Sequence, residues 1–291
     1  MLNKVERTAV LSRKEILSYH QDGYFVARNL FSGDEIAFYK AHFEEMRLRE
    51  AVRPHTDFGE PDFAETDPLI IYPRIMQPHR RDKASLNWLI DKRLNQIMTS
   101  LLGQEPFAVQ TMFYFKPPGA RGQALHQDQY YLRVQPGTCM AAWLAVDDCD
   151  NANGCIHVVP GSQEWPLLCL TDADTSVSFT DVTVDLPEGV HSIPVEMQAG
   201  DVLFFNGQIV HGSYPNTTSD RFRRAFIGHY IVGEAKQVYD WYHPVLRMDG
   251  TAVEFGTSEV GGTCGIWVDA DGQPELELQV EIPNEKVFGK A

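Results

Sequence analysis

The chain has 291 residues, of which 43% are hydrophobic, so it can bury a large core and is not expected to be intrinsically disordered. Its 25 Lys and Arg residues against 40 Asp and Glu give a formal net charge of −15, which repels nucleic-acid phosphates and anionic lipid. Basic residues form no long run, and no segment approaches about 18 consecutive apolar residues, so we expect neither a nucleic-acid partner nor a membrane.

Cysteine usage and the chain ends suggest a compartment. The five cysteines are an odd number and form no CxxC pair, which favours free thiols in a reducing compartment over disulfides or a cysteine zinc site. The N-terminal segment MLNKVERTAVLSRKE lacks the apolar core of a signal peptide, and the final FGKA is not a peroxisomal signal of the SKL type. We therefore expect a cytoplasmic protein, and leave open whether it forms a homodimer.

The N-terminal part of the chain begins with helical signals. Ser12 and Glu15 form a capping-box pattern for a helix that should end at Gly23. Residues 24–31 then alternate in the way that a strand does.

Two further helices flank a polar segment. Apolar residues at helical spacing predict a helix from Ser32 or Asp34 to about residue 50. Residues 51–83 are rich in Pro, Asp and charge, which predicts a long surface loop of the kind that forms lids or binding segments. Residues 84–103 predict one amphipathic helix that Gly103 closes.

From about residue 106 the chain consists of short β-rich runs. Gly, Pro, Asn and Asp separate these runs, and no long helical pattern interrupts them, which predicts an antiparallel sandwich or barrel. We expect one domain over 1–291, with a helical part at about 12–103, a β core at about 106–232 and a C-terminal extension at about 234–291.

A histidine and an aspartate lie two positions apart in the stretch ALHQDQYYLR. If this stretch is a strand, His126 and Asp128 face the same side and can reach one ion. His211, at the end of an apolar run, is the best third ligand, and two histidines with one carboxylate are typical of non-haem Fe(II) oxygenases. The alternative is that these are structural histidines, as we expect for His157 and His229, which have no carboxylate two positions later.

Three arginines follow His211 in the stretch DRFRRAF. A 2-oxoacid bound to iron leaves a distal carboxylate that needs a cation, and a guanidinium matches a carboxylate with two hydrogen bonds. Arg221 and Arg223 share one face if this stretch is extended, and Arg224 points the other way. The alternative is that all three are solvated charges at a sheet edge.

Taken in order, several of these pieces resemble one known family. HQDGYFVARNLFSGDEI, HQDQYY, AAWLAVDDCDNANGCIHVVPGS, GDVLFFNGQIVHGS and NTTSDRFRRAF are similar to segments of the phytanoyl-CoA dioxygenase family of Fe(II)/2-oxoglutarate-dependent oxygenases. The resemblance covers roughly residues 12 to 232. It implies a mainly β fold with flanking helices, a cupin-like double-stranded β-helix (jelly roll) that N-terminal helices buttress.

The resemblance also implies roles for single residues. It makes His126, Asp128 and His211 the iron ligands and Arg223 the partner of the distal 2-oxoglutarate carboxylate. The spacing from His211 is one residue longer than expected, so Arg221 is an alternative. The further positions that it places around the cosubstrate are Ser213, Trp143, Gln110 and Lys116, the last with a structural alternative.

The implied activity needs Fe(II), 2-oxoglutarate as cosubstrate and O2, and releases succinate and CO2. Asp128 argues against halogenation, because halogenating relatives lack this carboxylate. We expect hydroxylation of a small molecule, a natural-product or metabolite intermediate, while desaturation, cyclisation and epimerisation stay open. A non-enzymatic jelly-roll binding protein and a zinc hydrolase or isomerase are the alternatives from other classes.

The substrate is expected to lie above the iron, under the predicted loop. The local basic group within residues 72–82 is the part of that loop expected to touch it, with exposed loop charges as the alternative. The expected substrate contacts are Arg74 and His79, with Arg80 and Arg81 beside them, and Gln129 and Tyr131 after the metal-binding stretch.

Overall fold

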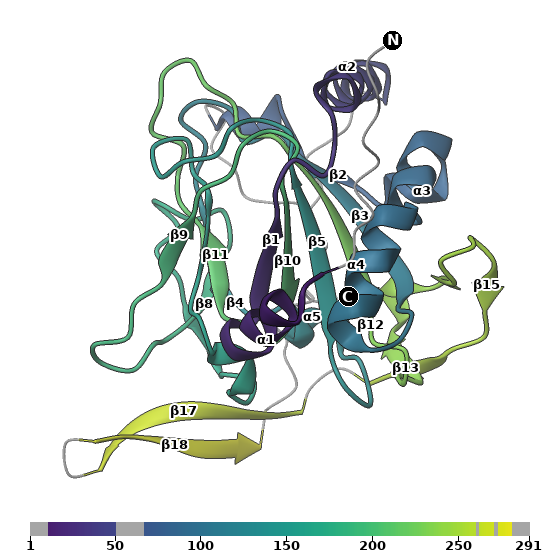
Figure 1. Ribbon diagram of the computed structural model, residues 1–291. Helices are drawn as coiled ribbons and strands as arrows, with labels where there is room; N and C mark the ends of the chain where they lie inside the picture. Colours follow the sequence, from purple (N-terminus) through teal and green to yellow (C-terminus); the bar gives the residue numbers. More distant parts are fainter. Residues whose placement is uncertain (1–10, 51–66, 260–261, 271–272, 281–291) are drawn as a thin grey trace.

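Two antiparallel sheets face each other, and helices cover the outer side of the larger one (Figure 1). The computed structural model describes residues 11–50, 67–259, 262–270 and 273–280. This is the predicted jelly roll with N-terminal buttressing helices, and its two sheets do not close into a barrel. None of the helices within the described part of the chain is long and apolar enough to cross a bilayer.

The larger sheet carries most of the β core. Its strands, in spatial order, are β1 (Tyr24–Ala27), β10 (Val202–Asn206), β5 (Cys139–Ala145), β12 (Ala225–Ile231), β3 (Phe107–Tyr114), β14 (Val245–Leu246) and β15 (Ala252–Val253), and β2 (Ile75–Met76) also pairs with β3. The smaller sheet contains β4 (Gln123–His126), β11 (His211–Ser213), β6 (Ile156–Val158) and β9 (Ile193–Val195).

Three two-stranded units lie beside these sheets. They are β7 (Leu170–Asp172) with β8 (Val182–Val184), β13 (Gln237–Tyr239) with β16 (Gly256–Ser258), and β17 (Thr263–Ala270) with β18 (Gln273–Val280). The last is a long hairpin at the bottom of the view in Figure 1.

The first two helices follow their sequence signals. In α1 (Arg13–Asp22), Ser12 is the N-cap of a complete capping box and Gly23 closes the helix with a φ of 81°. The next helix, α2 (Gly33–Glu50), follows as predicted. The strand between them, β1, ends at Ala27 and is shorter than predicted.

The single helix predicted over 84–103 is wrong. The chain forms α3 (Lys83–Leu89) and α4 (Lys92–Leu102), separated at Ile90 and Asp91. Asp91 accepts a hydrogen bond from the backbone N–H of Arg93 and is the N-cap of α4, because an aspartate satisfies free N–H groups better at a helix start than inside a helix. Gly103 ends α4 as expected, with a φ of 77°.

The predicted long loop needs a correction as well. Residues 51–66 of it lie outside the described residues, but residues 67–83 are not an open loop. They contain β2, which pairs with Phe113 and Met112 of β3, and the 3-10 helices Pro68–Ile70 and Pro78–Arg80. This segment is therefore an added edge of the larger sheet.

Two apolar layers fix the sheets in place. Between the larger sheet and the helices, Trp88 stacks on Phe226 and Phe43 stacks on Phe113, all of them buried. Between the two sheets lies a second layer, which includes Trp143 and Phe205 from the larger sheet and Val158 from the smaller one. The functional residues described next lie in this inter-sheet space.

The prediction of five free thiols is wrong for two of them. Cys169 and Cys264 form a disulfide, whereas Cys139, Cys149 and Cys155 are free and buried. The two bridged cysteines are 95 residues apart in sequence and have no CxxC spacing, so sequence spacing gave no sign of the pair.

Candidate metal centre

Three side chains converge where the smaller sheet meets the inter-sheet space. His126 ends β4 and His211 begins β11, and these two residues are directly paired across the strands. The Nε2 atoms of His126 and His211 lie 3.6 and 3.8 Å from Oδ1 of Asp128. One ligand atom from each residue can be chosen so that all lie within 4.8 Å of one another, which is the arrangement of a metal site.

The two imidazoles are oriented for a metal. Nδ1 of His126 lies 2.8 Å from the carbonyl of Ala124, and Nδ1 of His211 lies 3.1 Å from the carbonyl of Ile209. A carbonyl can only accept, so each Nδ1 carries the proton and each Nε2 is unprotonated; that of His126 lies 3.2 Å from the Gln123 side-chain amide, a contact that a bound metal would replace. Both lone pairs are thus available on the side where the Asp128 carboxylate lies, and the residues fit Fe(II).

Asp128 reaches the site by a different route from the one predicted. The strand ends at His126, and Asp128 lies in the αR region as the N-cap of a short helix, α5 (Gln129–Leu132). Strand alternation is therefore the wrong reason for the shared side, and the turn into α5 brings the carboxylate back toward the imidazoles. A two-residue spacing is compatible with both geometries, so the sequence pattern did not separate them.

Burial sets the charge state of the metal-binding group. Burial lowers the pKa of His126 to about 3 and also lowers the pKa of His211, so both imidazoles are neutral at pH 7. Burial alone would raise the pKa of Asp128, but the neighbouring histidines outweigh it and lower that pKa. Two neutral imidazoles and one carboxylate are the protonation states that a divalent cation requires.

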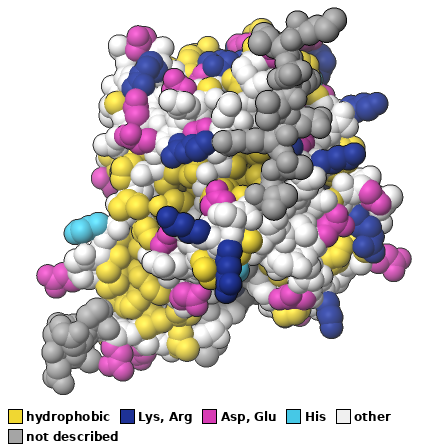
Figure 2. Space-filling view, viewed as in Figure 1, with side chains coloured by type: hydrophobic (Ala, Val, Ile, Leu, Met, Phe, Trp, Pro, Cys, Tyr) yellow, Lys and Arg dark blue, Asp and Glu magenta, His cyan; other side chains and the backbone are white. Residues whose placement is uncertain are grey.

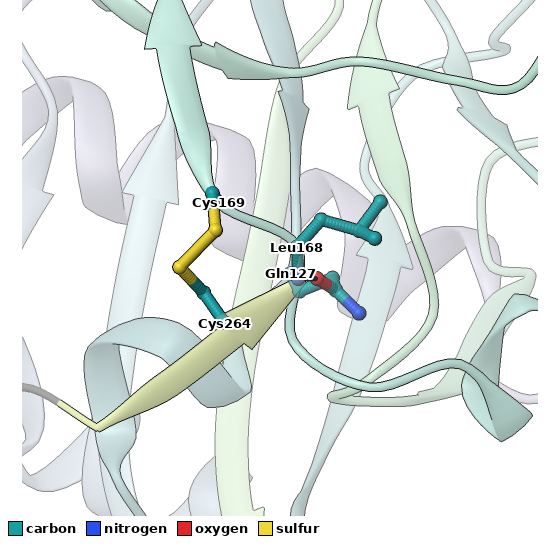
Figure 3. Close-up of a disulfide and its surroundings, with 4 residues drawn as sticks. All are labelled: Gln127, Leu168, Cys169 and Cys264. Atoms are coloured by element: carbon teal, nitrogen blue, oxygen red, sulfur yellow. Dashed lines mark hydrogen bonds between the residues drawn. A yellow bond between two sulfur atoms is a disulfide. The ribbon is translucent and has the colours of Figure 1, made fainter. Parts of the chain in front are cut away.

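Gln127, between two of the ligands, faces the other way and fixes the loop beneath them. Its Oε1 accepts from the backbone N–H of Leu168 at 2.8 Å, and its Nε2 donates to the carbonyl of Gln208 at 2.8 Å. Leu168 precedes Cys169 of the disulfide, and Figure 3 shows Gln127 beside this bridged segment. The C-terminal hairpin is thus covalently attached one residue after Leu168, which contacts Gln127.

A third histidine touches the carboxylate of this group. Nε2 of His229 on β12 lies 3.0 Å from Oδ2 of Asp128, and its Nδ1 lies 2.6 Å from Oε1 of Gln110 on β3. His229 has no carboxylate two positions later along its strand, as the sequence shows, but in space it contacts Asp128. The available signal was its strand position, since residues 223 and 229 differ by an even number and so share one face of an extended strand.

Arg223 is the buried cation of the site. Its side chain is 2% exposed, its Nε donates to the carbonyl of Gly154 at 2.9 Å, and its guanidinium carbon lies 5.2 Å from the ring centre of Trp143. No carboxylate of the described residues forms an ion pair with it. A buried guanidinium without an anion is unfavourable, so this position fits a ligand carboxylate.

The other two arginines are paired at the surface. Arg221 makes two hydrogen bonds to the Asp150 carboxylate, at 2.6 and 2.9 Å, and its side chain is 42% exposed. Arg224 binds Asp147 in the same two-point manner. The alternative of solvated edge charges therefore describes Arg221, but not Arg223.

Ser213 and Lys116 form a buried polar pair near Arg223. The Lys116 ammonium donates to Oγ of Ser213 at 2.8 Å, and Lys116 is buried. Burial, and then the charge of Arg223, hold the pKa of Lys116 well below its usual value. A ligand anion here would face two basic side chains and a hydroxyl, close to Trp143.

Gln110 also offers a polar atom to this space. One atom of its side-chain amide lies 2.6 Å from Nδ1 of His229, whereas the other is buried and has no hydrogen-bond partner within the described structure. A buried, unpartnered amide is unusual in a native protein and is typical of a site that a ligand completes. The predicted cosubstrate residues Arg223, Trp143, Ser213 and Gln110 all come from the strands, or the ends of the strands, that enclose the metal site.

The predicted substrate residues are not all gathered at the metal. The ring of Tyr131 lies edge-on to His126 at 6.0 Å between centroids, so it is close to the site. Arg74 donates to the Tyr114 hydroxyl at 3.1 Å, on the strand that also carries Gln110. Nδ1 of His79 instead contacts Thr111, which alternates with Gln110 and so points to the outer face of the larger sheet.

Gln129 and the two remaining basic residues have structural contacts. Gln129 donates to the carbonyls of Val134 and Gly137, and so holds the turn after α5. Arg80 donates to the carbonyls of Trp241 and His243, and Arg81 to that of Met76. On the face shown in Figure 2, basic side chains are intermixed with acidic ones instead of forming one patch.

A two-histidine, one-carboxylate centre inside a jelly roll, next to a buried arginine, defines the class of Fe(II)- and 2-oxoglutarate-dependent oxygenases. Sequence comparison narrows this class. The chain belongs to the phytanoyl-CoA dioxygenase (PhyH) family, whose profile matches residues 19–225.

Two curated relatives and one solved structure illustrate the likeness. Phytanoyl-CoA dioxygenase 1 of Oryza sativa subsp. japonica is 31% identical over 142 residues, which are 47% of this chain and only half, 50%, of the rice protein. The peroxisomal phytanoyl-CoA dioxygenase of Rattus norvegicus is 26% identical over 247 residues, 79% of this chain and 71% of the rat protein. The epimerase SnoN, solved with Fe3+, α-ketoglutarate and nogalamycin RO, matches 91% of this chain and 97% of its own with a TM-score of 0.63 at 18% identity.

Proposed function

We propose that this protein oxidises a small organic molecule with Fe(II) and 2-oxoglutarate, and that hydroxylation is the outcome. One observation carries the proposal: Arg223 is buried in the metal-binding space and has no carboxylate of the described chain to neutralise it. A zinc hydrolase on the same ligands has no use for such a cation. A 2-oxoacid requires one for its distal carboxylate.

The residues of the chain divide the work between them. His126, Asp128 and His211 would hold the iron, while Arg223 and the Ser213 hydroxyl would bind the distal carboxylate of 2-oxoglutarate. Trp143 beneath Arg223 and the free amide of Gln110 would limit how the cosubstrate lies. When bound, iron and 2-oxoglutarate together supply the activation of O2, with succinate and CO2 as products. The protein contributes orientation and the exclusion of water.

For the substrate we propose a natural-product or other metabolite intermediate. The likeness to SnoN, whose structure contains nogalamycin RO, supports this class by analogy alone. Tyr131 beside His126 and Arg74 beside Tyr114 are the expected substrate contacts that lie nearest to the metal-binding space. The same ligands serve desaturation, cyclisation and epimerisation, so the product decides the reaction type.

The test is anaerobic binding of Fe(II) and 2-oxoglutarate, followed by the visible metal-to-ligand charge-transfer band. We expect the band in the wild type, its loss in His211→Ala, and a weakening of 2-oxoglutarate binding by about 10- to 100-fold in Arg223→Ala, as is usual for loss of one buried charge-assisted contact.

Arg221→Ala is the matched control, since it removes an arginine two positions away that is already paired with Asp150. It should bind 2-oxoglutarate like the wild type. No band in the wild type would favour the non-enzymatic binding protein, and loss of binding in Arg221→Ala in place of Arg223→Ala would make Arg221 the anchor.

A further inference from the structure

The inter-sheet space holds one buried histidine that the proposed function does not use. His229 is 4% exposed and lies on β12, the strand that follows Arg223. Its side chain reaches across from the larger sheet to Asp128, which belongs to the loop after β4 of the smaller sheet. It is thus a direct polar link between the two sheets at the metal site.

The two oxygens of Asp128 have different partners. Oδ1 lies 3.6 and 3.8 Å from the Nε2 atoms of His126 and His211, whereas Oδ2 lies 3.0 Å from Nε2 of His229. A carboxylate can only accept, so the His229 Nε2 carries a proton and donates it to Oδ2. One oxygen is thereby directed at the metal position and the other is held away from it.

His229 itself is held from its other side. Its Nδ1 lies 2.6 Å from Oε1 of Gln110, which is its direct partner on the neighbouring strand β3. The register between β12 and β3 shifts immediately after this pair, with Tyr230 opposite Ala108, so the ladder contains a bulge here. Bulges beside functional sites change the direction in which a side chain points. This bulge lies directly after His229, the residue that contacts Asp128.

His229 is not a fourth ligand. Among the residues that the structure describes, the close group of metal-binding atoms contains only His126, Asp128 and His211. His229 contacts Oδ2 of Asp128, whereas the imidazoles of His126 and His211 lie nearest to Oδ1. A histidine in this position acts on the carboxylate and not on the ion.

We propose that His229 is a positioning residue that fixes Asp128 as a one-oxygen ligand through the Nε2–Oδ2 hydrogen bond. The inference rests on the proposed function, because it concerns the same metal site. Loss of the hydrogen bond frees Asp128 to rotate and leaves a buried carboxylate oxygen without its donor. Outer contacts of this kind alter metal affinity by about 10- to 100-fold.

Four variants separate this role from simple packing. His229→Phe keeps a ring of similar size without a hydrogen-bond donor. His229→Asn places an amide near the former Nδ1, so the side chain can still reach Gln110 but can no longer reach Asp128. His229→Gln places an amide N–H near the former Nε2 and restores the donor to Asp128. The control is His42→Phe. His42 lies on α2 and contacts the Asp82 carboxylate at the same 3.0 Å, and both residues are remote in sequence from the metal ligands.

The measurement is a titration of the metal-free protein with Co(II), followed by its visible absorption, with thermal unfolding recorded for each variant. We expect the dissociation constant to rise about 10- to 100-fold in His229→Phe and His229→Asn, and to stay near the wild-type value in His229→Gln and His42→Phe. The Fe(II)/2-oxoglutarate charge-transfer band should shift in the first two variants, which a merely structural role would not cause.

Equal affinities in His229→Gln and His229→Asn would overturn the inference, even if His229→Phe fails to fold. A wild type that binds neither Co(II) nor Fe(II) would instead sink the proposed function. The two failures are therefore distinguishable.

Discussion

Gly212 separates His211, a proposed metal ligand, from Ser213, a proposed contact of the cosubstrate. A Cβ atom at this position would lie 2.8 Å from the carbonyl of Gln123 and 2.9 Å from Nε2 of His157. Both contacts are shorter than van der Waals distance, and the first is with backbone that cannot move without opening the β4–β11 pair. The glycine therefore permits the close strand approach that brings His126 opposite His211.

We expect Gly212→Ala to destabilise the protein by about 1–3 kcal/mol, the usual range for overpacking, and to weaken Co(II) binding. The check is urea unfolding together with a Co(II) titration. Gly33→Ala is the matched control, since nothing lies within 4 Å of a Cβ there, and it should leave both quantities unchanged. If Gly212→Ala bound Co(II) like the wild type, close approach at Gly212 would not be needed for the site.

Individual residues show what the sequence could predict at this scale. His126 and His211 were predicted from the HxD spacing, from the apolar run that precedes His211 and from the family resemblance, all of which are visible in short stretches of sequence. His229 was not, because its contact with Asp128 joins residues 101 positions apart and depends on the packing of one sheet on the other. The spacing of residues along a strand does not show which residue of the opposite sheet faces a given side chain.

At the scale of elements, signals at helix ends were more reliable than signals within helices. The capping box at Ser12 and the glycine at 103 fix their boundaries through local hydrogen bonds. The apolar pattern over 84–103 continues through Asp91 and conceals the break there, since both helices pack on the same layer. The polar segment before it became β2 because the edge of β3 supplied backbone partners that no sequence pattern reveals.

The attachment of the C-terminal hairpin differs most from the sequence-based prediction, which expected no disulfide. Besides the disulfide, the N–H of Cys169 donates to the carbonyl of Gly265 and the N–H of Gly265 donates to the carbonyl of Leu167, so the hairpin also pairs with this segment through its backbone. The bridge closes a loop of 95 residues. In the chain-entropy description, a loop of this size stabilises the folded state by about 4–5 kcal/mol.

We expect the double variant Cys169→Ser/Cys264→Ser to unfold at lower urea concentration than the oxidised wild type, and a dithiol reductant to lower the wild type to the same midpoint. The reductant should leave the double variant unchanged, which is the control for effects on the other thiols. A thiol count in denaturant without reductant should give three free thiols for the wild type. A count of five would contradict the disulfide and restore the prediction of free thiols.

At the scale of the whole molecule, buried neutral histidines connect folding to pH. Burial lowers the pKa of His79 to about 4 and that of His157 to about 4. Both side chains are buried, and each Nδ1 contacts a hydroxyl oxygen, that of Thr111 or of Ser192. Protonation of either residue in the folded protein is therefore unfavourable until about pH 4.

Below about pH 6.5, the usual histidine pKa, the unfolded chain binds protons at His79 and His157 that the folded chain does not bind until about pH 4. Since the unfolded state then carries more protons, the free energy of unfolding must fall as the pH falls through this window. Each residue contributes a slope of up to about 1.4 kcal/mol per pH unit, so the pair contributes up to about 3 kcal/mol per pH unit.

Urea unfolding of the metal-free protein at pH 6.5, 5.5 and 4.5 measures this slope. The double variant His79→Gln/His157→Gln should show a slope smaller by that amount, because glutamine does not titrate. An unchanged slope in the variant would mean that other groups cause the acid sensitivity and that these two histidines are protonated in the folded protein.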